Sequence, residues 1–313
     1  MIFAHKTAGF ELPSWPKAHK CDRLLSGALK SRLGKPLQPT EPPEFPYWDA
    51  AYFGLDKVTI FRDATPDEQQ QILHLCSQEL LAEAYFIEKA GVGYMAKMTL
   101  MAETTQERML YAMFGADEAT HLGQIISFLP VEPAATSDKF LQLLSELVET
   151  EDKSLLLFLM QVVLEGWGLT HYRSLAKHCR YPGLGQMFYN FLQEESRHHA
   201  AGEMIFTETS LSIASEHAII EALTLFLQMV QAGPQRVVAV LERVKGHLSK
   251  AQKVKIFEEL DTEAHSGTRL AVLHGLMQPP NARGIVAELK QRGAFEPFSP
   301  SQCAALSEVA VSG

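Results

Sequence analysis

The chain has 313 residues, of which 46% are apolar, enough to bury one sizeable core or two small ones. Its formal charge of −9 argues against nucleic acid as a partner, because a phosphate backbone attracts basic surfaces. The longest apolar run, Leu155 to Leu164, is too short to cross a bilayer, and the N-terminus does not resemble a signal peptide. We therefore expect a cytoplasmic protein without a membrane partner.

The first segment, residues 1–64, is rich in proline and has no sustained hydrophobic periodicity. It contains too many aromatic residues for a free disordered tail. Those residues are Trp15, Phe45, Tyr47, Trp48, Tyr52 and Phe53. We expect this segment to form an ordered arm.

Two capping signals predict the first two long helices. Thr65-Pro66-Asp67-Glu68 combines an N-cap threonine, a proline at the first helical position and a glutamate three residues after the cap. A long helix should follow to about residue 102. Thr104-x-x-Glu107 repeats the capping box and begins the second helix, which Pro130 should end.

The remaining elements are also predicted to be helical, and no segment carries a convincing strand pattern. We expect a loop at 133–137, a short helix at 138–149, and long helices at 152–179 and 184–209, separated by Tyr181-Pro182-Gly183. Three or four amphipathic helices should follow in 215–292, broken at Gly233-Pro234 and Pro279-Pro280, before an irregular tail from 293. The predicted fold is all-α, with an arm (1–64), a four-helix bundle (65–210), accessory helices (211–292) and a C-terminal tail (293–313).

The pattern E-x29-E-x-x-H occurs twice in the predicted bundle. Its six positions, related by a shift of 77 residues, are Glu88, Glu118 and His121 and then Glu165, Glu195 and His198. A helix turns about 100° per residue, so a Glu and a His three positions apart share a face and can bind one metal ion. Two such pairs and two further glutamates supply the four carboxylates and two imidazoles found in dinuclear iron and manganese bundles.

Some neighbouring residues compete for the same role. Glu79 and Glu83 are also available on the first helix, but only Glu88 keeps the shift of 77 residues. His199 adjoins His198 and so points about 100° away from it, which disfavours it as a ligand. Four scattered cysteines without a C-x-x-C motif encode no rubredoxin-type iron site, so any electrons must come from outside the chain.

Polar companions of the ligands follow the same repeat. Asp117 and Glu194 each precede the motif Glu and lie four residues before the motif His, where they could accept the free ring N–H of a ligand histidine. The alternative is that both are ordinary surface acids. Arg197 is expected to be a structural ion-pair partner for the buried acids.

Small and apolar residues beside the motifs predict a pocket. Glycine costs a helix interior roughly 1 kcal/mol relative to alanine, and its occurrence at both Gly91 and Gly168 suggests that space is needed beside the metals. Phe114 and Phe191 lie one turn before the ligand glutamates. They either pack in the core or wall the metal site with apolar surface, and the two roles are compatible. Leu169 follows Gly168 in the same predicted pocket.

The segments DEATH at 117–121 and EESRH at 194–198, each with a Glu thirty residues before its motif Glu, resemble the ferritin-like non-haem di-iron carboxylate superfamily. The phrases FGADEATHLGQ and QEESRHHA are most similar to hydroxylase subunits of bacterial multicomponent monooxygenases. The resemblance covers roughly residues 66–209. It implies two iron ions, or a mixed manganese–iron pair, that activate dioxygen with electrons from a reductase or ferredoxin to oxidise a small or medium organic substrate.

Three departures narrow the activity that the resemblance implies. Ile125 stands where ribonucleotide reductase small subunits have a radical tyrosine, which disfavours a tyrosyl-radical role. Phe191 stands where arylamine N-oxygenases have a histidine, which disfavours that subgroup. Leu169 stands where the monooxygenase hydroxylases have a threonine, which argues against toluene- or methane-type hydroxylation. We expect an oxygenase or oxidase of hydroxylation or N-oxygenation type. Aldehyde-deformylating and desaturase enzymes and a non-enzymatic ferritin-like iron binder or ferroxidase are the alternatives. The arm and C-terminal helices would cover the bundle, shape the pocket or form a homodimer.

Overall fold

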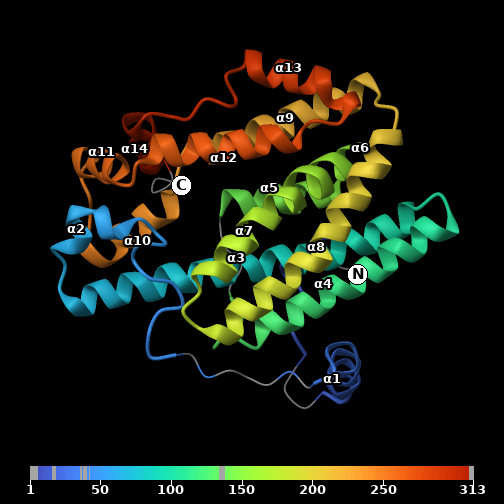
Figure 1. Ribbon diagram of the computed structural model, residues 1–313, viewed down its shortest axis with the longest axis horizontal. Helices are drawn as coiled ribbons and strands as arrows, with labels where there is room; N and C mark the ends of the chain where they lie inside the picture. Colours follow the sequence, from blue (N-terminus) through green and yellow to red (C-terminus); the bar gives the residue numbers. More distant parts are fainter. Residues whose placement is uncertain are drawn as a thin grey trace, which may run out of the picture. The chain divides into compact units, whose positions relative to one another are not determined.

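The computed structural model describes residues 6–15, 19–35, 37, 41, 43–133 and 138–309. Within these ranges the regular elements are helices, and none is a strand (Figure 1). The prediction of an all-α protein is confirmed.

The chain divides into two compact units that are discontinuous in sequence. The first unit comprises Met1–Pro42 and Leu80–Leu156, and the second comprises Pro43–Glu79 and Leu157–Gly313. The long helix α3, Pro66–Met101, contributes its first part to the second unit and its remainder to the first. Each unit carries one of the two E-x-x-H motifs.

The capping signals place the first long helices as predicted. At the start of α3 the Thr65 N–H donates to Glu68 Oε2 at 2.8 Å, and the Glu68 N–H donates back to Thr65 Oγ1 at 3.3 Å. Helix α4, Thr105–Ile126, begins after Thr104, whose hydroxyl accepts the Glu107 N–H at 3.1 Å. It ends four residues before Pro130, in a turn in which the Phe128 N–H donates to the Ile125 carbonyl.

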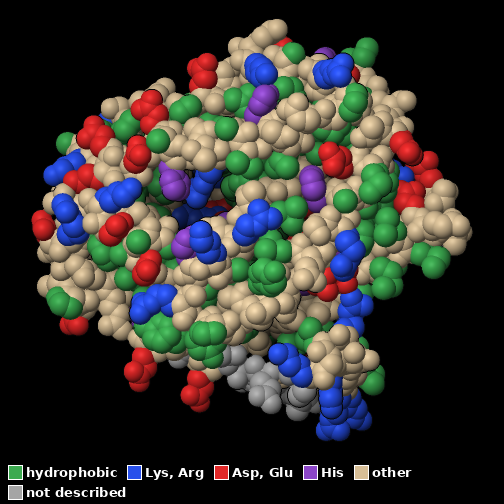
Figure 2. Space-filling view, viewed as in Figure 1, with side chains coloured by type: hydrophobic (Ala, Val, Ile, Leu, Met, Phe, Trp, Pro, Cys, Tyr) green, Lys and Arg blue, Asp and Glu red, His purple; other side chains and the backbone are tan. Residues whose placement is uncertain are grey.

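Three shorter helices complete the described elements of the first unit. They are α1 (Lys20–Leu33), α5 (Lys139–Glu149) and α6 (Lys153–Leu156). Basic side chains gather over α1 in Figure 2, and the sequence of this helix includes Lys20, Arg23, Lys30 and Arg32. Helix α1 lies against α4, where Gly123 leaves room for the Leu29 side chain. This contact brings Arg32 to the buried face of α4.

The N-terminal arm packs directly on α3. A Cβ atom built on Gly93 would lie 1.8 Å from the backbone oxygen of Thr7, so only glycine permits this approach. Phe10 packs edge to face on Phe86 at a centroid distance of 5.1 Å, and Lys89 Nζ donates to the Leu12 carbonyl at 3.0 Å. The described part of the arm is therefore ordered against the helix that carries Glu88.

The second unit contains the other motif helices and the C-terminal helices. A π-helix, η2 (Leu157–Glu165), runs into α7 (Gly166–His178), and α8 (Pro182–Glu208) begins at Pro182, inside the predicted break of 181–183. The other elements are η1 (Leu55–Lys57), α2 (Thr59–Arg62), α9 (Ile213–Gln231), α10 (Gln235–Lys245), α11 (Lys250–Glu259), α12 (Thr262–Leu276), η3 (Pro280–Ala282), α13 (Arg283–Gln291) and α14 (Pro300–Val309).

Helix α14 corrects the prediction of an irregular tail after residue 293. The Ser299 N–H donates to Gln302 Oε1 at 2.9 Å, and the Gln302 N–H donates to Ser299 Oγ at 3.4 Å, which together form a capping box. Cys303 and Ala304 then join a hydrophobic core with residues of α3, α10 and α11. Ser299-Pro300-Ser301-Gln302 is a helix-start signal of the same kind as Thr65-Pro66-Asp67-Glu68, and the sequence prediction missed it.

Residues 43–54 pack against the motif helices of the second unit. The Trp48 indole N–H donates to the Leu175 carbonyl at 3.0 Å, and the Arg180 N–H donates to the Tyr47 carbonyl at 2.8 Å. Trp48 is fully buried and packs near Phe188 of α8 at a centroid distance of 6.2 Å. These contacts fix the end of α7 relative to α8.

Among the described residues, two helical stretches have the length and composition of a membrane span. They are Lys153–His178 and Ile213–Gln231, and 56% and 33% of their apolar windows are buried inside the protein. A core helix of a soluble protein has the same length and composition, so this finding does not identify a membrane protein.

Candidate metal centre

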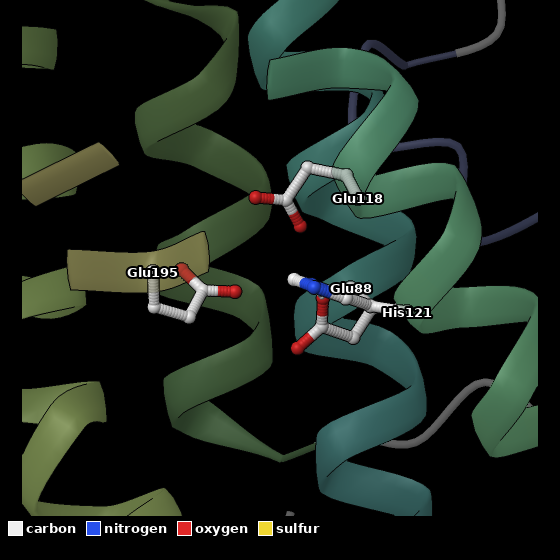
Figure 3. A group of neighbouring side chains, drawn as sticks. All are labelled: Glu88, Glu118, His121 and Glu195. Carbon is white, nitrogen blue, oxygen red and sulfur yellow. Dashed lines mark hydrogen bonds and ion pairs between the residues drawn. The ribbon is translucent and has the colours of Figure 1, made fainter. Parts of the chain in front are cut away.

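The first unit brings together Glu88, Glu118 and His121, here named the first triad. Glu88 projects from α3, and Glu118 and His121 project from one face of α4 (Figure 3). His121 Nδ1 lies 3.2 Å from Glu88 Oε2, and one donor atom from each residue lies within 4.8 Å of the others. The three residues are at most 5% exposed. The predicted ligands from this half of the repeat therefore form one buried cluster.

Gly91 makes room for the Glu118 carboxylate of the first triad. A Cβ atom on Gly91 would lie 2.4 Å from Glu118 Oε2 and 2.8 Å from Glu118 Cδ. Real side chains do not approach this closely, so alanine at this position would displace the carboxylate. The predicted space beside Gly91 is thus taken by a ligand side chain.

Asp117 has a partner that the sequence did not predict. Arg32 of α1 forms an ion pair with Asp117 Oδ1 through Nη2, and its Nε donates to Thr120 Oγ1 at 3.0 Å. Asp117 is 7% exposed, so it is not an ordinary surface acid. The hydrogen bond from a ligand histidine to Asp117 stays a prediction. Arg32 and Asp117 are 85 positions apart in the sequence. Helix α1, which carries Arg32, was not among the helices predicted from the sequence.

The second unit brings together Glu165, Glu195 and His198, here named the second triad. Glu165 is the last residue of the π-helix, and Glu195 and His198 lie three positions apart on α8. His198 Nδ1 lies 3.5 Å from Glu195 Oε2, and one donor atom from each residue lies within 4.8 Å of the others. Glu195 and His198 are buried and Glu165 is half-buried. The second triad repeats the composition of the first.

The π-helix before Glu165 corrects the prediction of a regular helix over 152–179. It contains Gln161, which is fully buried in a run of apolar residues. Its side-chain Nε2 donates to the main-chain carbonyl of His198 at 3.1 Å, and its main-chain carbonyl accepts a hydrogen bond from His199 Nδ1 at 2.9 Å. π segments are rare, and those inserted in α-helices often occur at functional sites. The single glutamine in the apolar run was the available sequence signal.

Phe114 and Phe191, which the sequence predicts to pack in the core or to wall the metal site, are both buried beside their motifs. Phe191 lies one turn before Glu195, with ring centroids 5.7 Å from Tyr172 and 5.9 Å from Phe188. Phe114 lies one turn before Glu118 and packs edge to face with Tyr111 at 6.1 Å. Each triad is therefore flanked by aromatic packing from its own unit.

The other predicted site residues are less buried. Gly168 and Leu169 are half-buried, and a Cβ atom on Gly168 would meet no atom within 4 Å. Glu194 is half-buried, whereas Arg197 is exposed and donates from Nη1 to the Gln193 carbonyl at 3.3 Å. The pocket role of Gly168 and Leu169 and the polar roles of Glu194 and Arg197 stay predictions.

The donor atoms of both triads fit a bound cation. An ionised carboxylate removed from water loses several kcal/mol of solvation unless a cation or hydrogen-bond donors replace it. Each triad offers two carboxylates and an imidazole without a thiolate, a set that suits iron or manganese. Gly91 leaves free the space that the Glu118 carboxylate occupies.

Comparisons with protein-family models, with curated proteins and with solved structures gave no match. The resemblance to di-iron carboxylate proteins therefore rests on the two motifs and the residues around them.

Proposed function

We propose that the first and second triads combine into one dinuclear centre and that the chain is a non-haem di-iron oxygenase or oxidase. The observation that carries this proposal is the duplication itself. Two largely buried clusters each contain two glutamates and one histidine, and each pairs an E-x-x-H helix with one further glutamate. Two iron ions would be held by six side chains, with a mixed manganese–iron pair as the alternative occupancy.

The fold that we propose for this centre is a ferritin-like four-helix bundle. Its four members would be α3, α4, the helix formed by η2 and α7, and α8. Such bundles bind metals through one Glu from each of two helices and a Glu-x-x-His motif from each of the other two. Along this chain the two kinds of helix alternate: Glu88, then Glu118-x-x-His121, then Glu165, then Glu195-x-x-His198.

The proposed reaction is the oxidation of a small or medium organic substrate by hydroxylation or N-oxygenation. When bound, the iron pair and dioxygen supply an oxidant for a C–H bond or an amine. The role of the chain is to hold the six donor atoms in place and to keep water away from them. Gly91 admits the Glu118 carboxylate, and Phe114 and Phe191 surround the motifs with apolar surface. An external one-electron donor in the cytoplasm would supply reducing equivalents.

Anaerobic reduction of the iron-loaded protein, followed by mixing with ¹⁸O-labelled dioxygen and a panel of alkanes, arenes and arylamines, tests this proposal. We expect dioxygen consumption coupled to a labelled product. Glu118→Ala and Glu195→Ala should abolish both, whereas Glu203→Ala, at an exposed position of α8, should behave as wild type.

One result would replace the oxygenase proposal with iron storage. A storage protein would assemble into a hollow shell and accumulate many iron atoms per chain, without forming an oxidised organic product. Electron microscopy and the iron count distinguish these outcomes in the same preparation.

A further inference from the structure

The π-helix and α8 are held together by a reciprocal pair of hydrogen bonds beside the second triad. The side-chain Nε2 of Gln161 donates to the main-chain carbonyl of His198, and the main-chain carbonyl of Gln161 accepts from Nδ1 of His199. The distances are 3.1 and 2.9 Å. Gln161 and His199, which we name the latch, are not ligands in the proposed centre.

Two glycines bring the latch residues into contact. A Cβ atom on Gly202 would lie 2.2 Å from Gln161 Cβ, and a Cβ atom on Gly166 would lie 2.8 Å from His199 Cε1. A larger residue at position 202 would collide with Gln161, and one at position 166 would displace the His199 ring. Gly202 and Gly166 thus leave the space that Gln161 and His199 occupy.

The latch connects directly to residues of the second triad. Gln161 lies four positions before Glu165 in the same π segment, and it bonds the backbone of the ligand His198. A π-helix closes i to i+5 hydrogen bonds and holds more residues per turn than an α-helix. Relaxation to an α-helix would rotate Glu165 about the helix axis, away from its present direction relative to Glu195 and His198.

We propose that Gln161 and His199 are positioning residues that hold the π segment in register with α8 and so aim the Glu165 carboxylate at the metal. This inference rests on the proposed dinuclear centre. Since the His199 Nδ1 faces a carbonyl, which only accepts, that nitrogen carries the hydrogen. The latch consequently needs a donor at the δ position of residue 199 and an amide at the end of residue 161.

Binding of Co²⁺ to the metal-free protein tests the latch. Titration gives the affinity, and the visible absorption spectrum of bound Co²⁺ reports its coordination geometry. Gln161→Met keeps the length of the side chain and removes the donor. Gln231→Met is the matched control, because Gln231 is buried in the same unit and its Nε2 donates to the carbonyls of Gly293 and Glu296 at 3.0 and 2.6 Å.

We expect Gln161→Met to weaken Co²⁺ binding at least tenfold and to change the spectrum of the bound ion. Gln231→Met should lower the melting temperature but leave affinity and spectrum unchanged. His199→Leu should act like Gln161→Met. His199→Asn should restore most of the affinity, because the asparagine amide nitrogen can occupy the place of Nδ1.

Each outcome supports or overturns the inference. If the wild type binds two Co²⁺ ions and Gln161→Met and His199→Leu reproduce its affinity and spectrum, the latch has only a structural role, while the dinuclear centre stands. Equal losses in Gln161→Met and Gln231→Met would likewise reduce the latch to general stability. If the wild type binds no Co²⁺, both the centre and the latch are refuted.

Discussion

A single methyl group added at Gly91 tests the geometry of the first triad. In Gly91→Ala the added Cβ would displace the Glu118 carboxylate, so we expect iron affinity to fall at least tenfold. Alanine stabilises a helix by about 1 kcal/mol relative to glycine, and this gain opposes the cost of moving the Glu118 carboxylate. The unfolding free energy of the metal-free protein should therefore change little. Iron titration and urea unfolding measure the two effects separately.

The control for this substitution is Gly275→Ala on α12, where a Cβ atom meets nothing within 4 Å. It should raise stability by up to about 1 kcal/mol and leave iron binding unchanged. Wild-type iron affinity in Gly91→Ala would show that the Glu118 carboxylate does not need the space beside Gly91 in order to bind metal.

Gly168 has the opposite surroundings and a different expected effect. Because a side chain at this position meets open space, Gly168→Leu should preserve iron loading while blocking an organic substrate. The measurement is the iron content of the purified variant together with product formation in a single turnover. Unchanged product yield and distribution would remove Gly168 from the pocket.

Asp117 should support the first triad through its contacts with Arg32, which is exposed, and with the buried Thr120. Losing a polar partner next to a metal ligand typically costs ten- to a hundredfold in affinity or activity. We therefore expect Asp117→Asn to weaken iron binding by about that factor, and Arg32→Met to act in the same direction because it removes the cationic partner of the carboxylate. Isothermal titration with Fe²⁺ under anaerobic conditions is the measurement, and normal affinity in both variants would limit this network to packing α1 on α4.

Residues within one helix were predictable, and contacts from distant segments were not. The spacing in Glu118-x-x-His121 fixes a shared helix face, and the structure places both beside Glu88. Arg32, Gln161 and His199 were missed because their roles depend on which helices pack together. No local periodicity encodes that information.

Capping chemistry determined the helix starts, whereas the interior of the third motif helix escaped prediction. Thr65 and Thr104 cap their helices through short-range hydrogen bonds that the local sequence specifies completely. The π-helix lies in an apolar run that is interrupted by Gln161 and contains no proline or glycine. Gln161 packs directly against Gly202 of α8, a tertiary contact that a linear pattern does not contain.

Helices α10 and α11 are joined by an ion pair that should make stability depend on pH. Lys253 Nζ, on a residue that is 3% exposed, lies 2.8 Å from Glu242 Oε2, and the Leu248 N–H donates to Glu242 Oε1 at 3.0 Å. Burial alone raises the pKa of Glu242, but the hydrogen bonds from Lys253 and Leu248 and the Lys253 charge lower that pKa overall. Since the folded pKa lies below the unfolded one, the stabilisation is present above the ordinary glutamate pKa and is lost as pH falls through the folded value.

We therefore expect Glu242→Gln to reduce the free energy of unfolding by about 2 kcal/mol at pH 7. This difference should hold down to about pH 5 and shrink below about pH 4.3. Urea unfolding across this range is the measurement. The exposed pair of Glu288 and Arg292 gives a control, because Glu288→Gln should change stability by less than about 1 kcal/mol at any pH. A difference independent of pH would contradict the electrostatic account.

At the scale of the whole molecule, the class of fold was predictable and the grouping of its segments was not. Helical periodicity and the lack of strand patterns indicated an all-α chain, which the described residues confirm. The compact units combine residues 1–42 with 80–156 and residues 43–79 with 157–313. Reading along the sequence suggests contiguous segments, because it does not show that distant segments share a core.

The central claim is that the two triads, one in each unit, share one pair of metal ions. Electron paramagnetic resonance of the protein loaded with two ferric ions per chain tests this most directly. Ions bridged by shared carboxylates are magnetically coupled, so we predict that the signal of isolated high-spin ferric ions will be absent and that it will appear when Glu118→Ala or Glu195→Ala breaks the pair. A wild-type spectrum in which isolated ferric ions account for all the bound iron would contradict a dinuclear centre.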